Sequence, residues 1–311
     1  MALFDAYIFI DWSAVNHPHP QQPAANAVWI GESIPALRHQ KESYHQTRHD
    51  AFEYVLTFIL DQVKGRRRVL VGFDFPYGYP VGLAEALGLG AGGEAWSHVW
   101  AELEKQVEDT PANVNNRFEV ASALNARINP EGAGPFWGCP AGRATQNLST
   151  HSPGFPFECA NGVHLRRLRI TERRLRGAQE TWKLFGAGSV GSQAIVGIPY
   201  VHRLRHHPEI CHHSKVWPFE TGFTEAPSQK TGPFILHAEI WPGVVEQQYQ
   251  DILAADPQLI RDQAQVRAMC KWASKLDVEG KLGQYFATPN GLTAKQKQIC
   301  TEQEGWVLGA R

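Results

Sequence analysis

The sequence lacks long hydrophobic runs and compactly spaced cysteines. No apolar stretch approaches the roughly 18 residues that a transmembrane helix needs. The five cysteines are odd in number and widely separated, which argues against a disulfide framework. The first segment, MALFDAYIFIDW, has no basic region and is interrupted by Asp5, so we expect a strand there rather than a signal peptide. These absences predict a cytoplasmic protein with no membrane contact.

An excess of charge of one sign is also absent. The chain has 30 Lys and Arg against 31 Asp and Glu, a formal net charge of -1. It is therefore not a polyelectrolyte binder as a whole, and any site for nucleic acid or phosphate must be local. Aromatic residues are plentiful, with 10 Trp, 15 Phe and 8 Tyr, enough for a large core and an aromatic-lined pocket.

Hydrophobic patterns at the two ends of the chain indicate an α/β sheet. Continuous apolar runs predict strands at 6–11, 27–30, 69–73 and 234–241. Apolar residues at helical spacing predict helices at 49–63 and 257–276, the second with Asp256 as its N-cap and Pro257 in its first turn. A short closing strand is expected in the last residues, EGWVLGA. Strands that are apolar throughout are typical of sheets covered by helices.

The middle of the chain has a different character. Residues 83–231 are rich in glycine and proline, with helices expected at 94–107 and 116–128 and long loops between them. We therefore predict a mixed sheet with flanking helices formed by 1–82 and 232–311. Residues 83–231 form a large, mainly helical and loop insertion that is expected to cover the site.

Three of the expected strands carry an acid near their carboxyl ends. Asp11 ends the first strand, Asp74 follows VLVGF, and Glu239 lies near the end of FILHAEIW. Ligands in α/β sheets sit at the carboxyl ends of strands. Taken alone, a strand-end aspartate often caps a turn, but three such acids suggest a shared site.

Two further acids interrupt apolar stripes. Asp262 occupies one slot of the stripe that Leu259, Val266 and Met269 form on the last long helix. Glu172 does the same if 165–182 is one helix, although LRITERR also fits a strand followed by a helix. A carboxylate on a buried face is costly unless something pairs with it.

A divalent cation would pair with several converging carboxylates at once. Oxygen ligands favour Mg²⁺ or Mn²⁺, and two-metal sites of this kind catalyse phosphoryl transfer. The expected metal ligands are the four acids on the strand ends and the helix stripe, namely Asp11, Asp74, Glu239 and Asp262.

Five segments together resemble a known family. These are FIDWS, VGFDFPYG, TER, AEIWPG and RDQAQVRA. They are similar to a family of predicted nucleases with a ribonuclease-H-like fold, catalogued as a domain of unknown function. The resemblance covers residues 5–82 and 232–309 best, and in the middle only 171–174. It implies a ribonuclease-H-like core and catalytic roles for five acids: Asp11, Asp74, Glu172 (paired with Arg173), Glu239 and Asp262.

The chain departs from that family in two ways. The usual opening meander of three strands shows only one clear second strand, and the insertion is long. The departures leave the class of substrate open, and fold alone does not establish function.

Several other segments could bind substrate. Arg173 and Arg174, in the arginine-rich stretch 166–176, could grip phosphates, or could belong to a solvated helix face. Tyr77 and Tyr79 are expected at the mouth of the site, where they could stack on a base. The loop LFGAGSVGSQ has a GxGxxG spacing but no expected strand before it and Pro199 soon after it. We interpret it as a loop that lines the site and binds an anion through Gly186, Gly188, Ser189 and Gly191.

Two remaining features indicate no site of their own. Residues 202–213 hold five of the 14 histidines and Cys211, but no zinc-finger spacing, so we interpret them as a surface loop. Cys139 would be a nucleophile only beside a histidine, and a structural role is expected.

Three functions fit the sequence. The leading hypothesis is a metal-dependent, nuclease-like phosphoryl-transfer hydrolase that acts on a phosphodiester or another phosphorylated substrate. Its partner would be nucleic acid or a small phosphorylated molecule. The first alternative is a non-catalytic scaffold that binds an anionic ligand. The second is a cofactor-biosynthesis enzyme that binds a nucleotide or a tetrapyrrole. The oligomeric state is not indicated.

Overall fold

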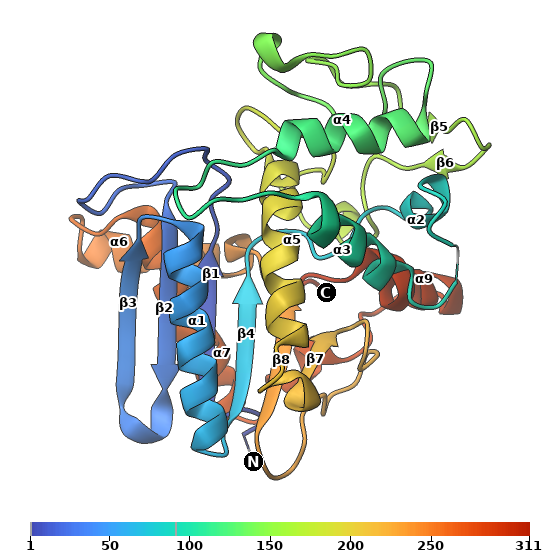
Figure 1. Cartoon of the computed structure of the whole chain (residues 1–311). Coiled ribbons are helices and arrows are strands. Elements are labelled where there is room, and N and C mark those ends of the chain that lie inside the picture. Colours follow the sequence, from blue (N-terminus) through green and yellow to red (C-terminus); the bar gives the residue numbers. More distant parts are fainter. Residues whose placement is uncertain (1, 91) are drawn as a thin grey trace.

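A six-stranded mixed sheet forms the centre of the molecule (Figure 1). The computed structural model describes residues 2–90 and 92–311. The strand order is β3-β2-β1-β4-β8-β7. The strands are β1 (Ala6–Asp11), β2 (Val28–Ile34), β3 (His39–His45), β4 (Arg68–Phe73), β7 (Ser214–Trp217) and β8 (Phe234–Glu239). The expected α/β sheet with flanking helices is confirmed.

The two central strands run in parallel and end side by side. β1 and β4 are apolar and buried except at Asp11 and Arg68, as the continuous hydrophobic runs predict. Ile10 of β1 lies opposite Phe73 of β4, and the amide of Asp74 donates a hydrogen bond of 3.1 Å to the carbonyl of Ile10. Parallel pairing therefore carries the residues just beyond both strands to the same edge of the sheet.

The opening meander of three antiparallel strands is complete. β2 is longer than the predicted 27–30, and β3 was not predicted. The sequence of β3, HQKESYH, buries only His45. It is an edge strand, and one edge and much of its surface face water. Its sequence therefore lacks the alternation of apolar and polar residues from which a strand is predicted. The expected departure from the nuclease family at this point was therefore wrong.

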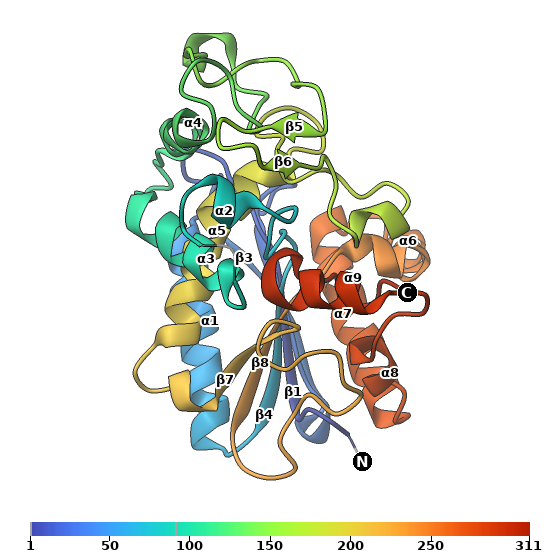
Figure 2. The same cartoon turned by 90° about the vertical axis from the view of Figure 1, so that its right-hand side faces the viewer.

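Helices cover both faces of the sheet (Figure 2). α1 (Arg48–Lys64) and α5 (Val190–His206) lie on one face, and α7 (Arg261–Val278) lies on the other. On the first face, Val55 and Ile59 pack with Ile8 and Val71. On the second, Ala268 and Met269 pack with Tyr7 and Phe9. The sheet thus forms the middle of three layers.

Helix α7 is fixed closely against the meander. A Cβ atom at Gly31 of β2 would lie 2.8 Å from the carbonyl oxygen of Val266, so only glycine admits this contact. At the other end of the helix, Asp277 accepts the amides of Leu3 and Phe4 at 2.7 and 2.8 Å. These contacts fix the position of α7 along the sheet.

The start of α7 differs from the prediction. The helix begins at Arg261, and residues 257–260 form a turn. Asp256 instead ends a separate helix, α6 (Glu246–Ala255), which was not predicted. The apolar stripe ran through both the turn and the helix, so periodicity did not reveal the break.

Part of the predicted insertion belongs to the layers of the core. α5 and β7 fall within 83–231, yet β7 pairs with β8 and α5 covers the sheet. The rest of that range, with α3 (Ala95–Gln106) and α4 (Arg117–Ile128) near their predicted positions, extends beyond the carboxyl ends of β1 and β4. The insertion therefore stands over the edge of the sheet where the acids were expected.

The remaining elements are short. They are α2 (Leu83–Ala86), α8 (Gly283–Phe286), α9 (Ala294–Ile299) and the two-stranded sheet of β5 (Phe157–Glu158) and β6 (His164–Leu165). The chain ends not in the expected strand but in a single parallel bridge between Val307 and Glu239. None of the helices in the described residues combines the length and the apolar character of a membrane span.

The contact at Gly31 gives a test of the fold. Gly31→Ala should lower the free energy of unfolding by about 1–3 kcal/mol, because the added methyl group must push α7 from the sheet. Gly142, where an added Cβ would meet nothing within 4 Å, is the control, and Gly142→Ala should change stability by less than about 0.5 kcal/mol. Urea denaturation measures both, and equal effects would contradict the packing described.

Candidate active site

Three aspartates from three different elements line one open cavity. Asp11 ends β1, Asp74 follows β4, and Asp262 lies in the first turn of α7. The cavity has a volume of about 790 Å³ and lies at the carboxyl edge of the parallel strands. The structure thus brings together three of the five acids singled out in the sequence.

Hydrogen bonds fix the orientation of these carboxylates. The amide of Trp12 donates to Oδ1 of Asp74 at 2.7 Å, and the amide of Asn26 donates to Oδ2 of Asp262 at 2.5 Å. Asp11 and Asp74 also act on each other electrostatically, and the charge of Asp74 raises the pKa of Asp11. Two neighbouring carboxyl groups repel each other when both are ionised, which favours retention of a proton by one of them.

The electrostatics follow from this crowding. Burial is the largest cause that raises the pKa of Asp11 well above its usual value, and the charges of Asp74 and Asp262 raise it further. Burial also raises the pKa of Asp74 to about 7, against the lowering effect of the Trp12 amide. The pKa of Asp262 is raised by burial as well. Such a group of acids retains a proton near neutral pH unless a cation replaces it.

The arrangement is not a finished metal centre. Within residues 2–90 and 92–311, no group of three or more His, Cys, Asp or Glu side chains is placed as a set that could hold a metal ion. The donor atoms are nevertheless carboxylate oxygens, which Mg²⁺ and Mn²⁺ prefer. A cation that bound here would have to displace the proton that the raised pKa values of Asp11 and Asp74 favour.

Glu239 and Glu172 lie apart from the three aspartates, on the two sides of Arg169. The guanidinium of Arg169 donates to both oxygens of Glu239, at 2.5 and 2.8 Å, and its Nε donates to Glu172 at 2.6 Å. All three side chains are buried. Glu239 is therefore neutralised by an arginine, and it does not line the aspartate cavity as the prediction of a shared metal site requires.

Arg169 was not recognised in the sequence. Its partner Glu172 is not on a long helix but in a short 3-10 turn, Glu172–Arg174. The network continues to Glu304, whose Oε2 accepts the amide of Ile170 at 2.6 Å. The signal available was the TER motif with an arginine three residues before the glutamate, a spacing at which oppositely charged side chains meet.

The two arginines proposed as phosphate clamps point elsewhere. Arg173 lines a separate hollow of about 340 Å³ with Phe155 and Arg166. Arg174 donates to the carbonyl of Asn290 at 2.7 Å. Neither lines the aspartate cavity.

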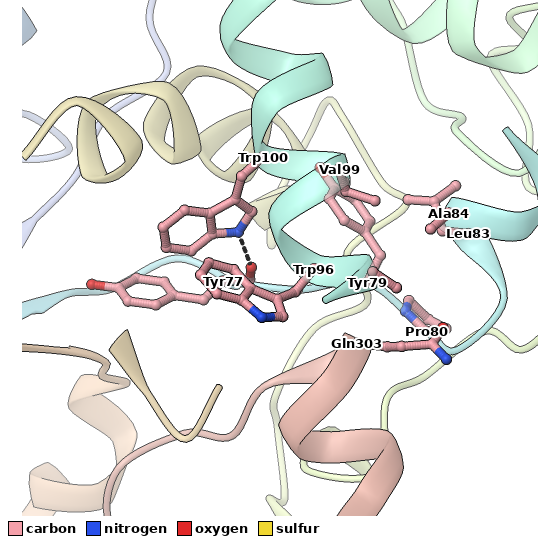
Figure 3. Close-up of a pocket in the computed structure, with 11 residues that line it drawn as sticks. Tyr77, Tyr79, Pro80, Leu83, Ala84, Trp96, Val99, Trp100 and Gln303 are labelled. Atoms are coloured by element: carbon pink, nitrogen blue, oxygen red, sulfur yellow. Dashed lines mark hydrogen bonds between the residues drawn. The ribbon is translucent and has the colours of Figure 1, made fainter. Parts of the chain in front are cut away.

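Tyr77 and Tyr79 are not at the mouth of the site. Both are buried, and Figure 3 shows them among packed aromatic side chains. The indole of Trp100 donates to the carbonyl of Tyr77 at 2.6 Å. The pocket beside them has a volume of only about 10 Å³, hardly room for one water. These aromatics form core, so no aromatic-lined pocket for a tetrapyrrole is found in this part of the described chain.

The glycine loop lines the aspartate cavity, as predicted. Gly186, Gly188 and Ser189 are in its wall. Gly186 and Gly188 have φ of +90° and +71°, which glycine adopts without strain. Gly191 is not in the wall. A Cβ there would lie 2.4 Å from the carbonyl oxygen of Thr181, so this glycine permits close packing.

A long helix follows this loop, contrary to the interpretation of Pro199 as a stop. α5 continues through Pro199 to His206. The helix starts at Val190, so its amino-terminal end points at the cavity. The histidine-rich segment is consequently only partly a loop, since His202 and His206 lie in the last turns of α5.

Other candidate groups play no part in the cavity. Cys139 is buried, and burial raises the pKa of its thiol, so it is a poor nucleophile. Arg117 and Arg261, in contrast, line the cavity and were not recognised. Each is the first residue of a helix, and nothing in local sequence distinguishes it from an ordinary surface arginine.

Comparison of the chain with family models, with curated proteins and with solved structures found no match. The resemblance to the predicted nucleases therefore rests on the short motifs alone.

The raised pKa of Asp74 predicts how stability depends on pH. An acid whose pKa is 3.8 in the unfolded chain and about 7 in the folded protein binds its proton more tightly when folded. The metal-free wild type should therefore lose stability as pH rises between these values. Asp74→Asn removes that loss and retains the oxygen that accepts the Trp12 amide. In EDTA its melting temperature should exceed that of the wild type above pH 7, and the difference should shrink as pH falls towards 4. A difference that does not vary with pH would contradict the assignment.

The Arg169 network should matter chiefly for stability. Arg169→Met leaves Glu172 and Glu239 buried without their cation, which should lower the free energy of unfolding by about 3–5 kcal/mol. Arg166 is exposed, so Arg166→Met is the matched control and should cost less than about 0.5 kcal/mol. Chemical denaturation measures the two variants, and a small effect at Arg169 would show that the network is dispensable.

Proposed function

We propose that the protein is a divalent-metal-dependent phosphoryl-transfer hydrolase, of nuclease type, with Asp11, Asp74 and Asp262 at its centre. The observation that carries the proposal is the convergence of these three acids on one open cavity. Their pKa values are raised by burial and by one another. A structural role would not require such a costly grouping, whereas functional sites commonly hold perturbed carboxyl groups.

The chemistry of the donors suits Mg²⁺ or Mn²⁺. Asp11 and Asp74 are the expected ligands, and Asp262 is the third carboxylate in reach of the same cavity. A bound cation would supply a Lewis acid that polarises a phosphoryl oxygen. Binding of the cation would displace the proton that these acids favour at neutral pH.

The chain's own groups would hold and orient the substrate. The same cavity is also lined by Arg117 and the amino-terminal end of α5, which favour a negatively charged ligand. Asp262 is held by the Asn26 amide and Asp74 by the Trp12 amide, so both carboxylates keep fixed positions at the reacting centre. The cavity therefore combines a position for a cation with a position for an anion.

Hydrolysis assays with Mg²⁺ and Mn²⁺ on DNA, RNA and nucleotides test the proposal. Asp11→Asn and Asp74→Asn should each lower the rate at least about a hundredfold, because each removes a charge that would hold the cation. The control is Asp251→Asn, on the exposed surface of α6, which should leave the rate unchanged. Absence of metal-dependent hydrolysis, or activity that survives both cavity variants, would rule the proposal out.

A non-catalytic anion-binding protein is the second candidate. It is favoured by the finding that no set of acids in the described residues is already arranged to hold a metal ion. Calorimetric titration with Mn²⁺ separates the two functions, because only the hydrolase requires stoichiometric binding that Asp11→Asn removes.

A further inference from the structure

Arg117 is a buried cation without a buried anion to balance it. Its exposed fraction is 9%, and it takes part in none of the ion pairs found in residues 2–90 and 92–311. The carboxylates that act on it most, Glu119 and Asp109, already pair with Arg143 and Arg48. Burying an unpaired charge is costly, so the site calls for an anion from outside the chain.

The guanidinium is held in one orientation. Its Nε donates to Oγ of Ser192 at 3.1 Å, and its Nη1 donates to Oδ1 of Asn115 at 2.8 Å. Ser192 is itself fixed, because its hydroxyl donates to the carbonyl of Leu184 at 2.5 Å. In the described chain Nη2 donates no hydrogen bond, which leaves it for a ligand in the cavity that Arg117 lines.

The start of α5 lies in the same wall. Ser189 makes no side-chain capping bond. The amides of Val190 and Ser192 find no acceptor outside the helix in the described residues. A helix of 17 residues presents a partial positive charge at this end, and its free amides can donate to a phosphate. Arg117 and the helix start therefore act on the same part of the cavity.

We propose that Arg117 and the amino-terminal end of α5 form a phosphate subsite that does not depend on metal. Ser192 and Asn115 position the arginine. The subsite would bind a phosphate adjacent to the one that is cleaved, which makes the substrate a strand with successive phosphodiesters rather than an isolated phosphate ester. The assignment of the neighbouring phosphate rests on the proposed function.

A chain of contacts links the anion subsite to the aspartates. Gln193, next to Ser192, donates to the carbonyl of Trp12, and Trp12 follows Asp11 and binds Asp74 through its amide. The anion subsite and the aspartates thus face one cavity of about 790 Å³, within the size range of a typical ligand site.

An aromatic side chain at the rim favours a single strand. Phe185 is 53% exposed and lines the cavity beside the glycine loop. An exposed aromatic ring next to a phosphate site is the arrangement on which unpaired bases stack. In the duplex the bases are already stacked on each other, so a single strand should bind more tightly.

Binding in EDTA tests the subsite without catalysis. The probe is a short fluorescein-labelled oligothymidylate, with inorganic phosphate as competitor. Arg117→Gln should weaken binding at least about tenfold, because it removes a charge-assisted contact. Arg176→Gln, an exposed arginine outside the cavity lining, should have little effect. No binding by the wild type, or equal binding by Arg117→Gln, overturns the subsite.

Hydrolysis with Mn²⁺ tests the neighbouring phosphate. Arg117→Gln should raise KM for the oligothymidylate and leave KM for bis-nitrophenyl phosphate, which has one phosphate, unchanged. An equal rise for both substrates overturns the assignment and indicates a structural effect. If Arg117→Gln does not fold, Ser192→Ala, which loosens the arginine but retains its charge, should show the same pattern more weakly. Binding in EDTA without any hydrolysis would leave the subsite standing and remove the proposed function.

Discussion

The parallel pairing of β1 with β4 determines where the acids can act. It carries Asp11 and Asp74 to one edge of the sheet, where the charge of Asp74 raises the pKa of Asp11. Two ionised carboxylates so placed repel each other, and other groups of the site must stabilise them. Amide donors from Trp12 and Asn26 fix Asp74 and Asp262, and all three aspartates line one open cavity.

A second group of buried acids differs from the three aspartates, because an arginine neutralises its charges. Around Arg169 the carboxylates of Glu172 and Glu239 are fully paired and closed off. A small hollow of about 50 Å³ touches both this network and Asp74. The five acids thus divide into an open group of three aspartates that lines the cavity and a closed pair of glutamates that fastens residues 169–172 to the core.

The sequence predicted the parts of this site that depend on regular structure. Continuous apolar runs placed Asp11 and Asp74 at strand ends, and helical periodicity singled out Asp262 even though it misplaced the start of α7. The sequence did not predict the long-range contacts. Nothing local shows that Glu239 meets Arg169, that Tyr77 turns into the core, or that Arg117 is buried without a partner, because each depends on segments far apart in the chain. The polar edge strand β3 was not predicted for a different reason, because its sequence has no apolar face.

Two glycines have a consequence for recognising distant relatives. Gly31 lets β2 approach the backbone of α7, and Gly191 lets the first turn of α5 approach the backbone at Thr181. Both contacts join backbone to backbone, so no repacking of side chains can make room for a larger residue. Hydrophobic positions in the same layers can exchange for one another as sequences diverge, whereas these two positions cannot. A chain that has lost every recognisable motif of this protein but retains its architecture should still have glycine at both places, at fixed offsets from its strand-end aspartate and its helix start.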